Sequence, residues 1–357
     1  MDSNWLDLYS DYLISSFSYT TATGLSKMVD GAISHDKTSK ELNKKSYGSK
    51  EWWQKVKPLL RQIEKENAVL IVDDSIQEKR YTDENDIVAW HYDHSKGRNV
   101  KGVNFVSLVY EQGELSLPIG YHLVAKTIPY SDLKTRKERR KSEVTKNEVF
   151  RDLIEKAKQN EVQFVYVLAD TWFASSGNMM YVKHKIGKDF VMPLKSNRKI
   201  ALNKENKLTG KYQKLESLTW KENETKEIYL KGVDFPLKLL KQVFKNKDGS
   251  EGILHLVSSD LELDSPQITT IYKRRWKVEE YHQSLKGNAS LAKSPTKTVR
   301  TQANHFFASL WAYVKLEMMK SKKKLSHSAM KAQIYVKSLQ AAFQELHLLK
   351  SNPLCVT

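Results

Sequence analysis

Cysteine is nearly absent from this chain: Cys355 is the single one among 357 residues. A lone cysteine excludes an intramolecular disulfide and a cysteine-rich zinc site, and it is typical of a protein in a reducing compartment. Long hydrophobic runs are absent too, because no apolar stretch approaches the roughly 20 residues that span a membrane. The first residues, MDSNWLDLYSDYL, carry acids where a signal peptide has a basic and then an apolar region. We therefore expect a cytoplasmic protein that is not inserted in a membrane.

Negative charge is scarce relative to positive charge. Lys and Arg number 59 against 42 Asp and Glu, which gives a formal net charge of +17. This balance favours a polyanionic partner such as a nucleic acid. A basic surface that serves only solubility is the alternative. The basic runs 134–141 and 320–324 are typical of solvated faces that add non-specific affinity for DNA.

Short apolar, β-branched stretches predict a sheet in the middle of the chain. Residues 68–75 (AVLIVDDS) and 163–169 (QFVYVLA) are apolar on both faces, as in central strands that are covered on both sides. Residues 101–110 and 115–127 flank a Gln-Gly pair and predict a hairpin. Helical patterns surround these strands, so the predicted fold class is α/β, with a mixed sheet flanked by helices.

The ends of the chain and one internal stretch differ from the predicted sheet region in composition and in residue pattern. Residues 195–262 are rich in Lys, Asn and Glu, and their short alternating segments predict a small β insertion outside the central sheet. Both terminal parts predict helices, and no helix-turn-helix pattern marks the first of them. We expect four parts: 1–66, a small helical domain and candidate DNA-binding module; 67–194 with 263–321, the main α/β domain; 195–262, the β insertion; and 322–357, a helical tail.

A helix is predicted from Tyr272 to Lys286 (YKRRWKVEEYHQSLK), because neither Pro nor Gly interrupts it and a glycine follows. The spacing places Tyr272, Arg275, Glu279, His282 and Lys286 on one face of that helix. An apolar stripe beside this face provides a seam for a core. A single carboxylate among basic residues suits a site that holds a metal and an anion.

Three acidic positions are candidates for chemistry. Asp73 or Asp74 and, later, Asp170 end buried strands, and Glu279 lies within the basic face of the predicted helix. A buried carboxylate without a partner is costly, so acids at the ends of apolar strands need one. Converging acids bind a hard divalent cation such as Mg²⁺ or Mn²⁺. Two such ions stabilise the attacking and leaving oxygens in phosphoryl transfer.

Each acid also has a simpler interpretation. An acid at the end of a strand is often a cap or a loop residue, which applies to Asp170 and to the pair Asp73 and Asp74. Glu279 can form an ion pair with Arg275 one turn earlier. The combination of acid-ended strands, an acid in a basic helical face and a net charge of +17 favours phosphodiester chemistry.

The spacing of four residues in the predicted helix carries a family resemblance. The pattern Tyr272-x2-Arg275-x3-Glu279-x6-Lys286 resembles the Y-(2)-R-(3)-E-(6)-K signature of IS4-type DDE transposases, the group that includes the Tn5 and Tn10 enzymes. The neighbouring Arg-Trp, Glu-Glu, aromatic and His residues match as well. A β insertion before the last acid is a further similarity, since residues 195–262 occupy that place.

The resemblance implies an RNase H-like catalytic domain in which Asp74, Asp170 and Glu279 form the catalytic, metal-binding triad. In several members of the family the first Asp is followed by Ser or Thr. This favours Asp74, which precedes Ser75, over Asp73.

DNA contacts are implied for four residues. Tyr272, Arg275 and Lys286 would hold the DNA backbone near the cut. Trp220 is the only Trp of the β insertion and is the candidate to stack on a flipped base, with packing in the core as the alternative.

The implied function is that of a bacterial insertion-sequence transposase, which cuts transposon ends and joins them to target DNA with Mg²⁺, or with Mn²⁺ in its place. The implied partners are double-stranded DNA and, in the DNA complex, a second copy of the chain; no membrane and no small-molecule cofactor are expected. The protein would then be associated with the nucleoid. An RNase H-like nuclease or domesticated derivative, and a non-catalytic DNA-binding protein from an inactive copy, are the alternatives.

Overall fold

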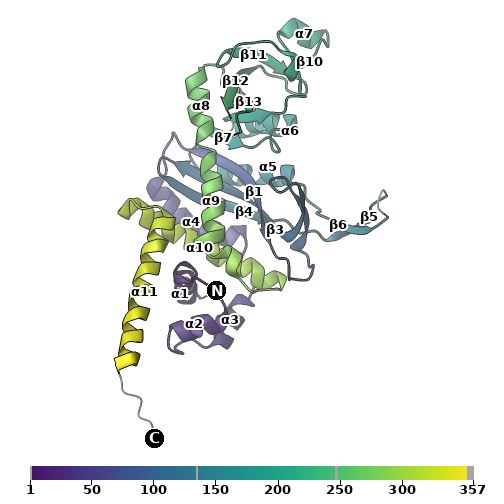
Figure 1. Cartoon of the computed structure of the whole chain (residues 1–357). Helices are drawn as coiled ribbons and strands as arrows, with labels where there is room; N and C mark the ends of the chain where they lie inside the picture. The colour runs from purple at the N-terminus through teal and green to yellow at the C-terminus, as the bar shows by residue number, and fades with distance from the viewer. Residues whose placement is uncertain (1, 134–135, 246–247, 352–357) are drawn as a thin grey trace. The chain divides into compact units, whose positions relative to one another are not determined.

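The computed structural model describes residues 2–133, 136–245 and 248–351 (Figure 1). Cys355 and the first two residues of the basic run 134–141 lie outside the described residues. The domain boundaries expected from the sequence remain a prediction. The chain divides into two compact units, of which the larger comprises Ser49–Arg80 and Asp86–Glu280, and the smaller Met1–Gly48, Tyr81–Asn85 and Tyr281–Thr357.

The sheet of the larger unit is built around β1 (Val69–Glu78), whose first four residues are completely buried. β1 pairs antiparallel with β3 (Arg98–Gln112) and parallel with β7 (Tyr166–Ala169). β7 in turn pairs parallel with β8 (Asp189–Leu194). A strand that is apolar on both faces belongs inside a covered sheet. The prediction of a mixed sheet flanked by helices is confirmed.

β3 is long enough to pair with further strands on its other edge. β4 (Leu115–Leu123) runs antiparallel along its second half, and the hairpin turn contains Gly113, whose φ of +60° favours glycine. β2 (Val88–Asp93) pairs antiparallel with the first half. The sequence patterns did not predict β2. The order of these strands is β4–β3–β1–β7–β8, with β2 also beside β3.

The strands of residues 195–262 continue this sheet. β13 (Glu251–Ser258) pairs antiparallel with β8, and the remaining strands follow outward from it. The prediction of an insertion outside the central sheet was therefore wrong. The physical reason is that Leu256 and Val257 of β13 are fully buried beside β8, whose free edge they cover. The outer strands are β12 (Leu237–Lys245), β11 (Thr225–Leu230), β9 (Lys199–Ala201) and β10 (Gln213–Lys214).

Helix α4 (Ser49–Ile63) packs against β4, and α5 (Lys146–Gln159) packs against β3 and β4. Trp52 of α4 is buried, and its indole Nε1 donates to the carbonyl of Pro118 at 2.8 Å. α5 starts at Lys146, because Thr145 and Glu148 form a capping box there. Further helical segments of this unit are α6 (Ser176–Met180), a π-helical turn (Tyr181–Ile186), α7 (Lys204–Leu208), a 3₁₀ turn (Leu215–Ser217) and α8 (Ser265–Lys273).

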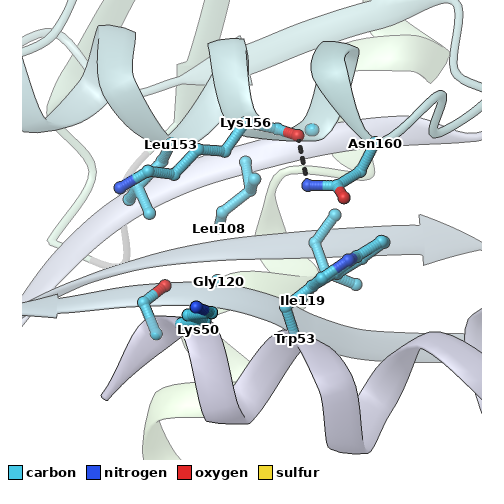
Figure 2. Close-up of a pocket in the computed structure, with 10 residues that line it drawn as sticks. Lys50, Trp53, Leu108, Ile119, Gly120, Leu153, Lys156 and Asn160 are labelled. Atoms are coloured by element: carbon cyan, nitrogen blue, oxygen red, sulfur yellow. Dashed lines mark hydrogen bonds between the residues drawn. The ribbon is translucent and has the colours of Figure 1, made fainter.

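A cavity of about 370 Å³ lies between α4, α5 and the strands β3 and β4 (Figure 2). Leu108, Ile119 and Leu153 give it apolar walls, and Lys50 and Lys156 contribute ammonium groups. Its lining residues include no acid. This cavity is therefore not where the predicted carboxylates meet.

The smaller unit is helical. α1 (Ser3–Ser15) packs against α10 (Val299–Lys323), and the Tyr9 hydroxyl lies 3.0 Å from Nδ1 of His305. Glu317 of α10 is buried and is held by Lys320 at 2.7 Å and by His327 at 2.9 Å. Further segments are α2 (Ala22–Met28), α3 (His35–Leu42), a 3₁₀ turn (Leu291–Lys293) and α11 (His327–Ser351).

A two-stranded sheet formed by β5 (Ile128–Ser131) and β6 (Glu138–Lys141) is separate from the main sheet and extends away from it (Figure 1). β6 contains much of the predicted basic run, and its residues are largely exposed. No helix within the described parts of the chain is long and apolar enough to cross a bilayer.

A substitution at Gly102 tests how closely the central strands pack. A Cβ at this position would lie 2.3 Å from the carbonyl oxygen of Gln77, a backbone atom that cannot move alone. Gly102→Ala is therefore expected to destabilise the protein by about 1–3 kcal/mol through overpacking, measured as a lower urea midpoint. Gly177→Ala is the matched control, because its Cβ would meet only Arg151 at 3.8 Å. Equal midpoints for the two variants would contradict the register of β1 and β3.

Candidate active site

The helix predicted from Tyr272 to Lys286 is interrupted. α8 ends at Lys273, α9 (Trp276–Gly287) follows, and the backbone hydrogen bonds between them span three residues instead of four. The Arg274 side chain fixes this break: it forms an ion pair with buried Glu111 and donates to the carbonyl of Asn67 at 3.0 Å. The prediction of one continuous helix was wrong because this tertiary contact outweighs local helix propensity.

Arg275 follows the break and lies between two acids. Its Nη1 is 3.2 Å from Oδ2 of Asp73 on β1 and 3.4 Å from Oε1 of Glu279 on α9. Oxygens of Asp73 and Glu279 lie within 4.8 Å of one another. The ion pair between Arg275 and Glu279, the simpler interpretation of Glu279, is present, and it is part of a cluster that also contains a strand residue.

Asp74 lies on the other side of β1. Its Oδ2 accepts from Asn104 Nδ2 at 2.9 Å and from Lys146 Nζ at 2.6 Å, at the start of α5. Neighbouring residues in a strand point to opposite faces, so only one of Asp73 and Asp74 can face α9. The acid that lies beside Glu279 is Asp73, whereas Asp74 lies beside Lys146. The choice of the first metal ligand stays a prediction.

Asp170 directly follows β7, next to the end of the apolar part of β1. Val72 pairs with Ala169, so Asp73 and Asp170 follow paired residues of two parallel strands. The Asp170 Oδ1 accepts from the backbone N–H groups of Trp172 at 3.0 Å and Phe173 at 3.2 Å. Asp170 thus orders its own loop, as the simpler interpretation holds, and it also brings a second carboxylate beside Asp73.

The proximity of these acids shifts their pKa values. Burial is the main cause that raises the pKa of Asp73 well above its ordinary value; repulsion from Asp170 adds to it, and the Arg275 guanidinium opposes it. Burial likewise raises the pKa of Asp170, where repulsion from Asp74 adds and the backbone hydrogen bonds oppose. Such a group of acids, partly neutralised by a single guanidinium, is typical of a functional site.

The donor set fits a hard divalent cation. Carboxylate oxygens are the ligands that Mg²⁺ and Mn²⁺ prefer, and a cation would offset the desolvation that raises the Asp73 pKa. The Glu279 side chain is 43% exposed, so the group is open to solvent on that side. Asp73 and Glu279 are thus residues that can hold a metal ion, and Asp170 remains a predicted ligand.

The other predicted site residues occupy different surroundings. Tyr272 is near the cluster: the Arg275 guanidinium lies 5.8 Å from its ring, and burial raises the pKa of its hydroxyl to about 12. Lys286 lies two turns beyond Glu279 on α9 and is half-buried. Trp220 is only 8% exposed, parallel to the His255 ring of β13 at 6.3 Å between centroids. Its surroundings are those of a core residue.

Sequence reasoning missed Lys146 and Trp172. Lys146 is the first residue of α5, where the helix dipole disfavours a cation; this unfavourable position was a signal that it has an acidic partner. Trp172 is 48% exposed, two residues after Asp170. A large exposed aromatic residue immediately after a candidate catalytic acid was the second signal.

The chain belongs to the DDE superfamily of endonucleases. The model of that family matches residues 4–217, more than half of the chain. The matched residues contain Asp73, Asp74 and Asp170, and Glu279 lies beyond them. A search among curated proteins found none that matches this chain. Membership implies DNA as the substrate class and a divalent metal ion in the reaction.

Asp73→Asn tests the buried charge. Because the folded pKa of Asp73 is raised, the folded state binds this proton more tightly than the unfolded state, and stability falls as pH rises above the unfolded pKa of about 4. Without metal, Asp73→Asn is expected to raise the melting midpoint at pH 7 and to weaken its fall between about pH 4 and 7. Thermal unfolding across that range measures both effects.

The control for this variant is Asp152→Asn, which removes an exposed acid paired with Lys156 on α5. It is expected to change stability by less than about 0.5 kcal/mol at any pH. A lower midpoint for Asp73→Asn than for the wild type at pH 7 would show that the pair with Arg275 outweighs the burial of Asp73.

Trp220 has a separate test. As a core residue it should lose about 3–5 kcal/mol of stability on substitution by Ala, and much less on substitution by Phe. Chemical denaturation measures the difference. Unchanged stability of Trp220→Ala together with weakened DNA binding would favour base stacking instead.

Proposed function

We propose that this protein is a metal-dependent DNA transposase of the IS4 type, encoded by a bacterial insertion sequence. The observation that carries the proposal is that acids from separate parts of the chain lie near one another. Asp73 and Asp170 follow paired residues of adjacent parallel strands, and Glu279 of α9 lies within 4.8 Å of Asp73. Membership in the DDE endonuclease superfamily and the net charge of +17 support the same reading.

The strand order supports an RNase H-like catalytic domain. β4, β3 and β1 form an antiparallel series, and β1, β7 and β8 a parallel one. The acids belong to β1 and to the end of β7, at the middle of this arrangement. The strands β9 to β13 extend the sheet before the chain reaches Glu279, which fits the β insertion of the IS4 type.

The roles we assign follow from position and charge. Asp73, Asp170 and Glu279 hold the metal, and the proposal replaces Asp74 by Asp73 as first ligand. When bound, Mg²⁺ or Mn²⁺ would lower the pKa of water and neutralise charge that develops on the phosphate. Tyr272, Arg275 and Lys286 are the candidates to contact the DNA backbone. Arg275 already reduces the repulsion between the acids that it contacts.

The test is cleavage of DNA that carries the sequences flanking this gene, with Mg²⁺, followed by an assay for joining to a target plasmid. Asp170→Asn and Glu279→Gln are expected to lower the cleavage rate by at least about a hundredfold, because each removes a charge from the reacting site. Asp152→Asn, outside the site, should retain the wild-type rate. Wild-type rates in both site variants would refute the proposed chemistry, and cleavage without joining would favour a nuclease.

Asp73→Asn and Asp74→Asn form a matched pair of variants of adjacent residues. If Asp73 is the first ligand, Asp73→Asn abolishes cleavage, and Asp74→Asn reduces it less, through the loss of its bonds to Asn104 and Lys146. The opposite ranking would return the role to Asp74.

Metal binding is measurable without cleavage. Mn²⁺ at about a hundred times its dissociation constant should stabilise the folded protein by about 2.7 kcal/mol, seen as a higher melting midpoint. Glu279→Gln should reduce this shift, and Asp152→Asn should leave it unchanged. An equal shift in all three proteins would place the metal elsewhere.

We also propose that two copies act together on DNA. Within the described part of the chain, α11 exposes several large apolar residues, an arrangement that favours a partner surface. These residues are Val336, Leu339, Phe343, Leu346 and Leu349. Replacement of Leu339 and Phe343 by Asp should shift the DNA-bound protein from dimer to monomer in light scattering. A dimer that survives both changes would exclude α11 as the interface.

A further inference from the structure

Three rings form a connected aromatic row beside the acids, within the larger unit. The row consists of Tyr92 at the end of β2, His94 in the following turn and Trp172 after β7. The centroids of Tyr92 and His94 are 4.9 Å apart, and those of His94 and Trp172 are 5.5 Å apart. The interplanar angles are 77° and 48°. The rings are therefore tilted and do not cover one another's faces.

All three rings are accessible. Tyr92 is 53% exposed and Trp172 is 48% exposed, and His94 is also exposed. A contiguous exposed patch of apolar residues, unlike scattered single ones, indicates an interaction site. The three rings therefore form one aromatic patch in contact with solvent.

The backbone beneath this row is fixed. The Asp170 Oδ1 accepts from the N–H of Trp172, so the candidate metal ligand and the ring share one turn. The Asp93 Oδ1 accepts from the N–H groups of Ser95 and Lys96, at 3.0 Å and 3.2 Å, and orders the turn that carries His94. An aromatic row whose backbone is fixed in this way loses little conformational entropy when it binds a ligand.

One cation lies beside the row. The ammonium group of Lys146 lies 6.0 Å from the centroid of the Trp172 ring and 2.6 Å from Asp74. The chain as a whole carries a net charge of +17. Planar rings next to a cation are the combination that binds single-stranded nucleic acid, where bases stack on the rings and cations contact the phosphates.

We propose that Tyr92, His94 and Trp172 bind unpaired nucleotides next to the phosphate that is cleaved. This inference rests on the proposed function, because Asp170 then marks the position of that phosphate. An aromatic face stacks only on a base that has left the duplex. The aromatic row is therefore a device for holding an opened DNA end, distinct from the residues that bind the metal.

The test compares binding of two DNA probes in the presence of EDTA, so that cleavage plays no part. One is a fully paired duplex, and the other carries a tail of about six unpaired thymidines. The wild type should bind the tailed probe more tightly. Trp172→Ala should weaken binding of the tailed probe about tenfold, a typical loss for one stacked base, and leave the paired duplex unchanged. His94→Ala should act in the same direction.

Two further variants separate stacking from folding. Trp172→Phe keeps a ring and should retain most of the affinity for the tail. Phe244→Ala removes a ring on β12 that is 50% exposed and should change neither probe. Equal affinity of wild type and Trp172→Ala for the tailed probe would overturn the inference. So would an equal loss on both probes.

Failure of this inference and failure of the proposed function give different results. If Asp170→Asn abolishes cleavage while Trp172→Ala binds the tailed probe like the wild type, the aromatic row is excluded and the chemistry stands. If Trp172→Ala selectively loses the tail while Asp170→Asn still cleaves, the row binds DNA and the assigned chemistry is wrong.

Discussion

The structure of the candidate active site depends on one energetically unfavourable feature, the burial of the Asp73 carboxylate at the centre of a sheet. Burial and the nearby Asp170 both disfavour its charged form, and Arg275 offsets part of that cost. The guanidinium holds Asp73 and Glu279 on its Nη1. Replacement of buried ion pairs by apolar residues of similar volume is often neutral or stabilising, so stability alone does not account for these acids. DDE endonucleases use divalent metal ions, and we propose that these acids hold one.

β1 separates two chemical environments, one on each face. Asp73 meets Arg275 and Glu279 from α9, and Asp74 meets Lys146 at the start of α5 and Asn104 of β3. The aromatic row lies on the Lys146 side of this division, since that ammonium group is close to the Trp172 ring. The proposed metal ligands and the aromatic row thus consist of different residues but share the turn after β7, in which the Asp170 carboxylate accepts from the Trp172 backbone N–H.

The family match and the site geometry complement one another. The match covers residues 4–217 and so includes the acids of β1 and β7. The last acid, Glu279, follows a long stretch that extends the sheet by antiparallel pairing from β8 outward. The chain then returns through α8, and Arg274 anchors the break before α9 by its bonds to Glu111 and Asn67. That anchor decides where Arg275 and Glu279 lie relative to β1.

Much of this was predictable from the sequence, because the signals are local. Apolar, β-branched runs marked β1 and β7, a helical spacing marked the face that holds Arg275 and Glu279, and the acids at the strand ends stood out by their unfavourable placement. Contacts between distant residues decided the rest. A choice between Asp73 and Asp74 requires the direction in which each residue of β1 faces, and only the packing of α9 on one side and α5 on the other supplies it. The break at Arg274 and the pairing of β13 with β8 likewise depend on residues that are far away in the sequence. Local sequence patterns do not identify such contacts.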